Sequence, residues 1–245
     1  MELSEYTTMF ELEDRHWWYV GLRQLLLSLW AREVRAECPA VLDVGCGTGA
    51  NLIALNDLAA KPVGIDFAPQ AVRFCRTRGL SRTAVASALM IPFGAESFDV
   101  VVSCDVLCHS SIRDKSVALR EMHRVLRTGG LVFLNLPAYQ WLFSSHDEAY
   151  QQDRRFTRAA VLKLLRANGF EPVTATYWNS FLFPAAAVAR LWRNLRNPEG
   201  SDLQTGSAQS ASRLFGAMLR GERAFIRRFP LPFGLSVFAV GRKVR

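Results

Sequence analysis

From residue 40 onward, the chain alternates short runs rich in β-branched and aromatic residues with segments of helical periodicity. The candidate strands are residues 40–45, 62–66, 84–87, 98–104, 131–137, 170–178 and 235–243. The first five alternate rapidly with helical patterns, and this order is typical of a doubly wound sheet, because each parallel pair needs a helical crossover. We therefore expect one α/β domain with helices on both faces of a seven-stranded sheet.

Two helices are predicted from their end signals. In residues 113–130 the apolar spacing indicates a helix that is stopped by Gly129 and Gly130. Thr157 is a candidate N-cap for a second helix, which we expect to end at Gly169.

The positive charge of the chain is concentrated near its end. The net charge is +8, and residues 179–245 hold 11 Lys and Arg against 3 Asp and Glu, so this segment carries the whole excess. All but one of these basic residues are arginine, which suits phosphate and the surfaces of lipids and aromatic rings.

About sixty residues separate the sixth and seventh candidate strands, far more than a hairpin needs. Two amphipathic helices are predicted in this insertion. The apolar face of the first comprises Val188, Leu191, Trp192 and Leu195, and that of the second comprises Leu214, Phe215, Met218, Leu219, Phe225, Ile226 and Phe229. These faces suit either contact with an anionic membrane or packing on the sheet as a lid over a substrate.

The start of the chain lacks the basic and apolar order of an export signal, and the longest apolar runs are shorter than the roughly 20 residues of a spanning helix. We expect a cytoplasmic protein, either free or peripheral at the inner face of the membrane. The five cysteines are odd in number and lack CxxC spacing, so neither disulfides nor a metal site is predicted.

The run VLDVGCGTGAN is the strongest functional signal. A strand leads through Asp43 to Gly45, Gly47 and Gly49 at the start of a helix, and these glycines let the backbone turn and approach a ligand closely. A dinucleotide loop of the form GxGxxG would place glycine where Ala50 stands, so the spacing disfavours NAD.

Asp66 ends the next candidate strand, in GIDFAP, seventeen residues beyond Gly49. A carboxylate at this edge of the sheet can accept hydrogen bonds from both hydroxyls of a ribose. The glycine loop and this acid together predict a nucleoside-containing ligand.

In combination, DVGCGTG, GIDFAP, LMIPF before FDVVVSCDVLCH, and REMHRVLRTGG resemble the class I S-adenosylmethionine-dependent methyltransferases. The resemblance implies a Rossmann-like fold with an antiparallel last strand, S-adenosylmethionine as methyl donor and S-adenosylhomocysteine as product. It divides the chain into a helical cap (1–39), an α/β core (40–179), the basic insertion (180–233) and the final strand (234–245).

The same resemblance assigns residues to the cofactor. Relatives with the pattern DAxxLPF place an aspartate against the adenine amine, whereas this chain has Ser87 there, so adenine would rest on Ser87 and its neighbours. The expected cofactor residues are Asp43, Gly45, Cys46, Gly47, Gly49, Asp66, Phe67, Ser87, Ala88, Leu89, Cys104, Trp18 and Arg23.

A general base is needed if the methyl acceptor is a poorly ionised hydroxyl. His109 follows the fourth strand and is the first candidate, with a structural role in capping the next helix as the alternative. His146 with Asp147 is a second candidate, although these residues also suit an ordinary loop with an Asp–Arg pair. Glu222 is expected either to bind the substrate or, by preference, to pair with Arg223.

The run HWWY precedes the first strand. In similar enzymes this segment forms a helix over the open edge of the sheet, where Trp17, Trp18 and Tyr19 would exclude water from the acceptor and Arg23 would meet the methionine carboxylate. Ordinary core packing of the tryptophans is the alternative. Together with the loop HD…RRFT and the ending PFGLS, the run resembles a bacterial subgroup that acts on small molecules or lipids.

Three functions follow from these patterns. The first is methyl transfer to a small or lipid-like acceptor, with oxygen as the favoured atom. The second is methylation of nucleic acid, which suits an isoelectric point of about 9.7 but lacks the [DN]PPY motif after the fourth strand. The third is a non-catalytic protein that binds the cofactor or acts as a scaffold. Nucleic acid is therefore not an expected partner, and the sequence leaves the oligomeric state open.

Overall fold

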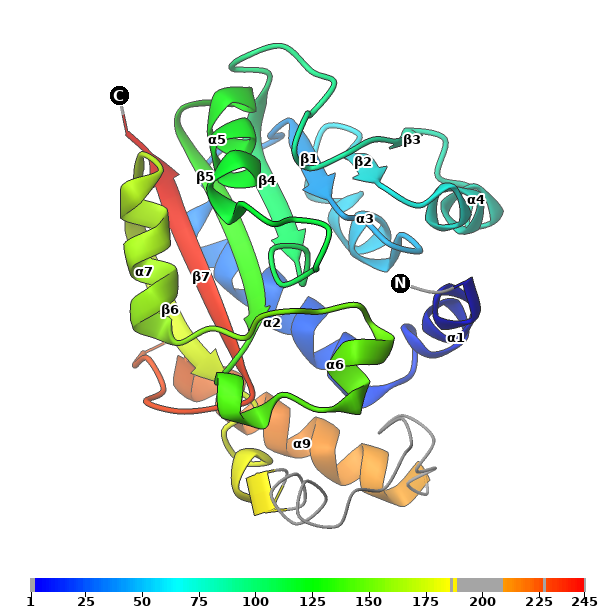
Figure 1. Cartoon of the computed structure of the whole chain (residues 1–245), viewed down its shortest axis with the longest axis vertical. Coiled ribbons are helices and arrows are strands. Elements are labelled where there is room, and N and C mark those ends of the chain that lie inside the picture. The colour runs from blue at the N-terminus through cyan, green and yellow to red at the C-terminus, as the bar shows by residue number, and fades with distance from the viewer. Residues whose placement is uncertain (1–2, 186, 189–208, 227, 245) are drawn as a thin grey trace.

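The computed structural model describes every residue except 1–2, 186, 189–208, 227 and 245 (Figure 1). Its elements are α1 (Leu3–Leu12), α2 (Trp17–Glu33), β1 (Val41–Val44), α3 (Ala50–Leu55), β2 (Val63–Asp66), α4 (Pro69–Thr77), β3 (Thr83–Val85), β4 (Phe98–Cys104), α5 (Lys115–Val125), β5 (Leu126–Pro137), η1 (Gln140–Leu142), α6 (Ser145–Ala149), α7 (Arg158–Ala167), β6 (Phe170–Trp178), α9 (Gln209–Ile226) and β7 (Ser236–Lys243).

The strands form one seven-stranded sheet with the order β3-β2-β1-β4-β5-β7-β6. The pairs from β3 across to β5 are parallel, whereas β7 runs antiparallel to both β5 and β6. The predicted Rossmann-like class I methyltransferase fold, with its antiparallel last strand, is confirmed.

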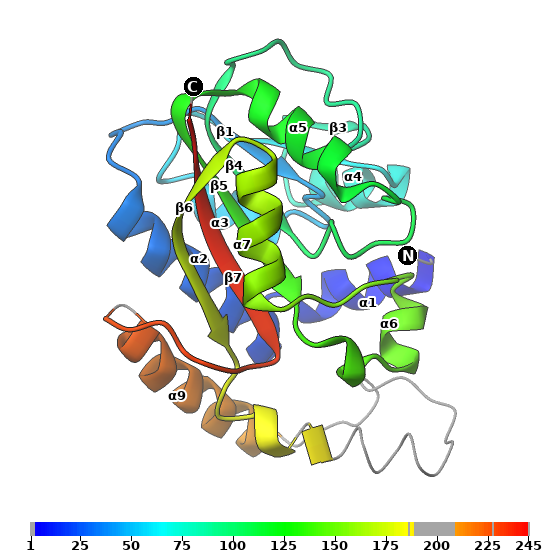
Figure 2. The same ribbon diagram turned by 60° about the vertical axis from the view of Figure 1, so that its left-hand side comes forward.

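Helices cover both faces of this sheet (Figures 1 and 2). On one face, α5 and α7 bury Leu119, Met122 and Leu165 against the strands. On the other, α2 lies along the sheet and α9 packs beside it, where Leu26 and Leu219 share a second apolar cluster. The two clusters divide the core into the layers that an α/β fold requires, since a parallel sheet is apolar on both sides.

Most predicted boundaries agree with the structure to within one residue, and larger differences occur around β5 and β3. The helix α5 ends at Val125, before the two glycines, because the strand β5 already begins at Leu126. Leu126 pairs with Phe98 and the register shifts before Val100, so the stretch that precedes Leu131 belongs to an irregular strand end. The third strand is also shorter and earlier than expected, at Thr83–Val85.

The N-terminal segment is helical, but most of it does not lie over the edge of the sheet. In α2, Leu22, Leu25, Leu26 and Leu29 are buried at helical spacing against the sheet face, so only the first two turns reach the carboxyl edge. The edge beside β1 and β2 is covered by α1 instead (Figure 1).

In the insertion, the predicted helix over residues 184–197 falls mostly outside the described residues. The second predicted helix is present as α9, but its apolar face is divided. Leu219 and Ile226 are buried, whereas Phe225 and, just beyond the helix, Phe229 are exposed and pack on each other at 5.6 Å. Part of the apolar face is therefore used inside the protein, and part remains on the surface.

Candidate functional site

A cavity of about 1650 Å³ lies at the carboxyl ends of β1, β2 and β4. Its walls come from the glycine loop after β1, the end of β2, residues 86–89, the segment after β4, α1 and the first two turns of α2. This is the edge at which open α/β sheets bind their ligands. Because single-ligand pockets commonly measure about 300–1000 Å³, the cavity is large enough for two molecules side by side.

The glycine loop is held tightly to the sheet. The backbone N–H groups of Gly45 and Cys46 both donate to the carbonyl of Ile65 on β2, at 2.7 and 3.0 Å. Gly45 has a φ of +76°, and a Cβ there would lie 2.1 Å from Cγ2 of Val106. Only glycine satisfies both conditions, so the loop can lie this close to the segment after β4.

Asp66 is an organised acceptor at the end of β2. Its Oδ2 accepts from the N–H of Gly47 at 2.9 Å, and its Oδ1 accepts from the N–H of Ala68 at 2.9 Å and the hydroxyl of Tyr6 at 3.3 Å. Burial raises the pKa of this carboxyl, and the three donors oppose that rise. The carboxylate is therefore oriented toward the cavity before any ligand arrives.

The wall next to Asp66 suits a flat, apolar ring. Phe67 lines the cavity and remains 72% exposed, an unusual state for a large apolar side chain. Ala88 and Leu89 line the same wall, and the Ser87 hydroxyl accepts from the N–H of Leu89 at 3.1 Å. These are the residues that the sequence assigned to adenine.

Asp43 lies beneath the loop and does not line the cavity. It is 1% exposed, and neither carboxylate oxygen has a hydrogen-bond partner among the described residues. Burial, followed by the charges of Asp66 and Glu13, raises its pKa to about 7. Asp43 is therefore an orphaned acid behind the glycine loop, and neither of its oxygens is exposed to the cavity.

Gly49 also lies behind the loop. It caps α3 with a φ of +95°, and a Cβ there would meet the side chains of Leu80 and Cys75. The remaining residues predicted to hold the cofactor, from Gly45 through Cys104 together with Trp18 and Arg23, line the cavity.

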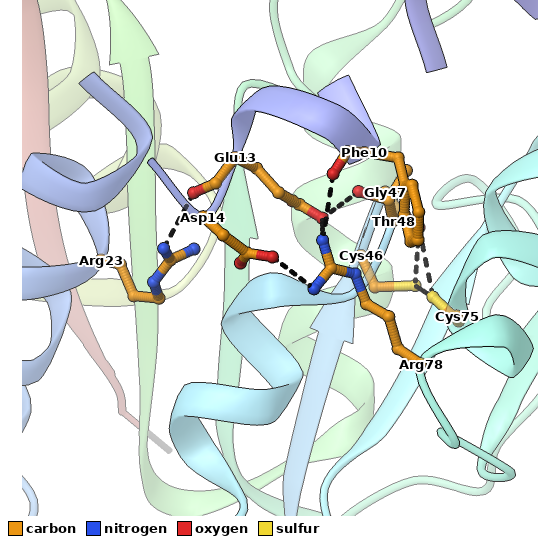
Figure 3. Close-up of polar contacts among 9 residues, drawn as sticks. All are labelled: Phe10, Glu13, Asp14, Arg23, Cys46, Gly47, Thr48, Cys75 and Arg78. Carbon is orange, nitrogen blue, oxygen red and sulfur yellow. Dashed lines mark hydrogen bonds and ion pairs between the residues drawn. The ribbon is translucent and has the colours of Figure 1, made fainter. Parts of the chain in front are cut away.

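Polar contacts among Glu13, Asp14, Thr48 and Arg78, together called the latch, hold the end of α1 over the glycine loop (Figure 3). The buried Glu13 carboxylate accepts from the hydroxyl of Thr48 and pairs with Arg78 at 2.8 Å. Arg78 also pairs with Asp14 at 2.8 Å and stacks over the ring of Phe10 at 4.6 Å. This latch brings Tyr6 and Met9 of α1 into the cavity wall.

Arg23 makes a hydrogen bond within the protein. Its guanidinium donates to the carbonyl of Glu13 at 2.8 Å, which joins α2 to the end of α1 (Figure 3). Burial lowers the pKa of Arg23, while Glu13 and Asp14 oppose the change. Although Arg23 lines the cavity, its hydrogen bond in the structure supports the cap.

The HWWY run forms an aromatic wall. The ring of His16 caps α2 by accepting from the N–H of Trp18, and Trp17, Trp18 and Tyr19 all line the cavity. Trp18 packs edge-on against Tyr19, with 5.0 Å between ring centroids, and in a tilted arrangement against Trp178, with 5.9 Å between centroids. Adjacent helical residues point in different directions, yet all three reach the cavity because it extends around the first turn of α2.

His109 lines the cavity on the segment after β4. Its Nδ1 lies 2.8 Å from the hydroxyl of Ser111 and accepts from the N–H of the same residue at 3.2 Å. Burial lowers the pKa of the imidazole, which keeps it neutral near pH 7. Both predicted roles, as a base and as a local cap, fit this position.

The other two acidic candidates have structural partners. Asp147 is completely buried and forms a two-point ion pair with Arg155, with 2.9 and 3.0 Å between the hydrogen-bonded atoms. Glu222 is buried away from the cavity, where it accepts from the N–H of Ser180 at 2.8 Å. Glu222 therefore lies outside the cavity, and its carboxylate bonds to backbone N–H groups rather than to a charged side chain among the contacts described. The side chain of His146 lies outside the described residues.

Several cavity residues escaped the sequence analysis. Tyr6 and Met9 of α1 and Glu13 just after it reach the site from a segment whose sequence carries no recognisable motif. Asp105 stands in the quoted run CDVLCH, and its position directly after a strand was the signal that could have found it. Across the described residues, no cluster of His, Cys, Asp and Glu is arranged to hold a metal ion.

Comparison with known proteins defines the class. Residues 42–134 match the family described as "Methyltransferase domain". These residues contain the glycine loop, Asp66 and the segment after β4, so this part of the chain matches a methyltransferase domain, and the methyl donor that the match indicates is S-adenosylmethionine.

Relatives with different substrates match this part of the chain. The mouse (Mus musculus) protein named "Probable tRNA methyltransferase 9B" is 32% identical over 123 residues, which span 50% of this chain and 25% of the mouse protein. A demethylmenaquinone methyltransferase of Roseiflexus castenholzii is 36% identical over 101 residues, 39% of this chain and 42% of that protein. The chain thus spans only a minor part of either relative.

A solved structure supports the fold over most of the chain. The geranyl diphosphate C-methyltransferase of Streptomyces coelicolor, in complex with S-adenosylhomocysteine, superposes with a TM-score of 0.59 at 18% identity and covers 90% of this chain and 77% of that one. None of the helices in the described part of the chain is both long and apolar enough to cross a membrane.

Proposed function

We propose that the protein transfers a methyl group from S-adenosylmethionine to a hydroxyl of a small or lipid-like acceptor. The observation that carries this proposal is a large cavity that combines a nucleoside-binding wall with an aromatic wall. The first wall consists of the glycine loop, Asp66 and Phe67, and the second consists of Trp17, Trp18 and Tyr19. An apolar wall favours an acceptor with an apolar body and excludes water from the reaction.

The cofactor supplies an activated methyl group when it is bound. In the proposal, Asp66 holds the ribose, Phe67 with residues 87–89 holds the adenine, and the loop Gly45–Gly47 lies along the methionine portion. The aromatic wall then aligns the acceptor, because an in-line displacement depends mainly on the orientation of the reacting atoms. The cap (1–39), the core (40–179) and the insertion (180–233) would supply these parts, and residues 234–245 complete the sheet.

Exposed aromatic residues beside the cavity support a lipid-like acceptor. Leu182 lines the cavity, and its neighbour Phe181 is 63% exposed. Trp141 and Phe233 are exposed close by, and both pack against Phe183, at 5.9 and 5.6 Å. An apolar surface next to the cavity would let the protein collect its acceptor from the cytoplasmic face of an anionic membrane, with the arginines of the insertion among the phosphates.

Two measurements test this proposal. Binding of S-adenosylmethionine by calorimetry tests the cofactor site, and transfer of a labelled methyl group to 4-dodecylphenol and dodecyl glucoside tests the acceptor class. Sedimentation with anionic and neutral liposomes tests the membrane. The variant for sedimentation should be Phe181→Ser with Phe229→Ser, since both side chains are exposed. Deletion of the insertion is less suitable, because Leu219 belongs to the core.

Selective loss of binding to anionic liposomes in the double variant would support the membrane surface. If the intact protein stays in the supernatant, membrane docking is rejected under those conditions, the insertion is better interpreted as a lid, and soluble acceptors are screened first.

A tRNA substrate is the second candidate. It is supported by the name of the mouse relative and by the basic charge of the chain. The same labelled assay, run with total tRNA, distinguishes the two: label in the RNA and none in either amphiphile would replace the first proposal with the second.

A further inference from the structure

Asp105 is a carboxylate in the wall of the cavity that no motif assigned. It follows the last residue of β4 and lines the cavity together with Cys104, Trp18 and Tyr19. It therefore lies at the edge of the sheet where the glycine loop and the aromatic wall meet.

The backbone of Asp105 is held in an unusual conformation. Its φ is +57°, in the left-handed region that few residues other than glycine adopt. The N–H of Asp105 donates to the carbonyl of Asn135 at 2.9 Å, and its own carbonyl accepts from the thiol of Cys108 at 3.1 Å. Surrounding structure thus maintains a strained residue, a pattern that is enriched at functional sites.

The carboxylate is oriented by a chain of buried hydrogen bonds. The indole N–H of Trp178 donates to Oδ1 of Asn135 at 2.7 Å, which leaves the amide nitrogen of Asn135 facing Asp105. That nitrogen lies 3.1 and 3.0 Å from the two carboxylate oxygens. Among the described residues, the Asn135 amide is the hydrogen-bond donor to both carboxylate oxygens of Asp105. These oxygens therefore keep lone pairs that can accept a proton from a ligand.

The charged and titratable groups around Asp105 leave it without a direct ion pair in the described part of the chain. The charge of Arg155 lowers the pKa of Asp105, but Arg155 is paired with Asp147, whose own charge raises that pKa. Besides burial, the charge of Asp105 in turn raises the pKa values of Tyr19, Cys104 and Cys108. Burial raises the pKa of Asp105 to about 7, while the Asn135 amide and Arg155 oppose the rise.

We propose that Asp105 is the catalytic base, and that its carboxylate takes the proton of the acceptor hydroxyl during methyl transfer. The acceptor oxygen forms a bond to the methyl carbon as the carbon–sulfur bond of the donor breaks. The electron pair of that bond stays on sulfur, the hydroxyl proton moves to Asp105, and the proton then passes to solvent. This inference rests on the proposed function, since it requires a hydroxyl acceptor.

His109 is a weaker candidate for this role. Its Nδ1 is engaged with the hydroxyl and the N–H of Ser111, so this nitrogen is used within its own turn. Asp105, in contrast, is held from the sheet by Asn135 and Trp178. A rigidly held base near its operating pH is the more effective arrangement for proton transfer.

The test compares the whole protein with Asp105→Asn and Asp105→Ser. Asparagine tolerates the left-handed backbone, and serine removes the carboxylate without placing a second amide opposite Asn135. Asp57→Asn, at an exposed position in the turn after α3, is the matched control. Each protein is assayed for thermal stability, binding of S-adenosylmethionine, and transfer of labelled methyl to 4-dodecylphenol and dodecyl glucoside across pH 5–9.

We expect both Asp105 variants to bind the cofactor normally while kcat falls about 100-fold or more, the range for loss of a general base. The wild-type kcat should rise with pH through about 7, since the carboxylate must be ionised, and the variants should lose this rise. A second readout needs no turnover: NMR of carboxyl-labelled aspartate should show a signal that titrates near pH 7 and is absent from Asp105→Asn.

The outcomes separate the two proposals. Normal kcat and an unchanged pH profile in the Asp105 variants would overturn the role of Asp105 and leave the proposed function standing. An Asp105 signal that titrates near pH 4 would also overturn it. If the wild type binds the cofactor but methylates neither amphiphile, the hydroxyl acceptor fails, and the role of Asp105 fails with it.

Discussion

The latch between α1 and the glycine loop can be tested by the substitution Arg78→Met. The side chains of Arg78 and Glu13 are 11% and 7% exposed and lie 2.8 Å apart. Methionine preserves the length of the side chain but leaves Glu13 buried without its cation. The expected consequence is local opening of α1 while the sheet stays folded, because the latch holds only the end of the cap.

The magnitude follows from the burial of the pair. Removal of one partner from a buried ion pair costs about 3–5 kcal/mol, since the other charge stays in a poorly solvated place. Burial raises the pKa of Glu13, so protonation can relieve part of this cost. We therefore expect about 3 kcal/mol at pH 8, which corresponds to roughly 100-fold in an equilibrium constant, and a smaller effect at pH 5.

Hydrogen exchange of the amides in residues 3–12 is the assay, because local opening of a helix is measured directly by the loss of protection. The expected result is exchange about 100-fold faster in Arg78→Met, together with weaker binding of S-adenosylmethionine, since Tyr6 of α1 contacts Asp66. Adding Glu13→Gln should restore part of the protection by removing the unpaired charge.

The matched control is Arg127→Met. Arg127 pairs with Asp99 at 2.8 Å, but the two side chains are 51% and 31% exposed, and exposed pairs contribute about 1 kcal/mol or less. Equal protection of residues 3–12 in Arg78→Met and in this control would refute the argument that the latch holds the cap.

Three further substitutions test other parts of the site. Because burial raises the pKa of Asp43 to about 7, the folded state binds this proton more tightly than the unfolded state, and the free energy of unfolding falls as pH rises from 4 to 7. In urea titrations without cofactor, Asp43→Asn should remove this pH dependence and raise the free energy of unfolding at pH 7.5 by up to about 4 kcal/mol. If the free energy of unfolding of the variant depends on pH as that of the wild type does, the burial argument is contradicted. Gly45→Ala should abolish cofactor binding, because the added Cβ would lie 2.1 Å from the side chain of Val106. The control Gly79→Ala has a similar φ of +79° but nothing within 4 Å of the added Cβ, so it should only lower the free energy of unfolding by about 1–2 kcal/mol. Similar calorimetric affinities of the two variants for the cofactor would disprove the steric explanation. Glu222→Ala should lower the free energy of unfolding by about 1–3 kcal/mol in urea titrations without weakening cofactor binding, since it removes a buried acceptor of backbone N–H groups. A selective loss of cofactor affinity would instead support a role for Glu222 in the binding site.

Parts of the fold and the site could be predicted because their signals are local. The strands and the helices α5 and α7 follow from short-range periodicity and end signals, and the glycine loop follows from spacing within a few residues. Asp66 was predictable as well, because a residue at the end of a parallel strand must lie at the same edge as the loop. The location of these features in the fold therefore follows from the residues immediately around them in the sequence.

Other parts of the site depend on contacts between distant residues. Tyr6 bonds to Asp66 across sixty positions, and Glu222 caps a turn forty-two positions away. The periodicity of α9 predicted its apolar stripe, but the structure decided that Leu219 would pack against α2 and that Phe225 would face solvent. No local pattern carries this information.

The sequence by itself determined the class of fold and the cofactor loop, because backbone geometry at glycines and strand ends depends on local residue types. Only the tertiary structure decided which acids act as acceptors within the protein and which face the cavity. Glu222 became a buried cap, Asp43 an orphaned acid and Asp105 a carboxylate held by Asn135. The physical reason is that the role of an ionisable group depends on its burial and its partners, and both are set by packing between distant segments.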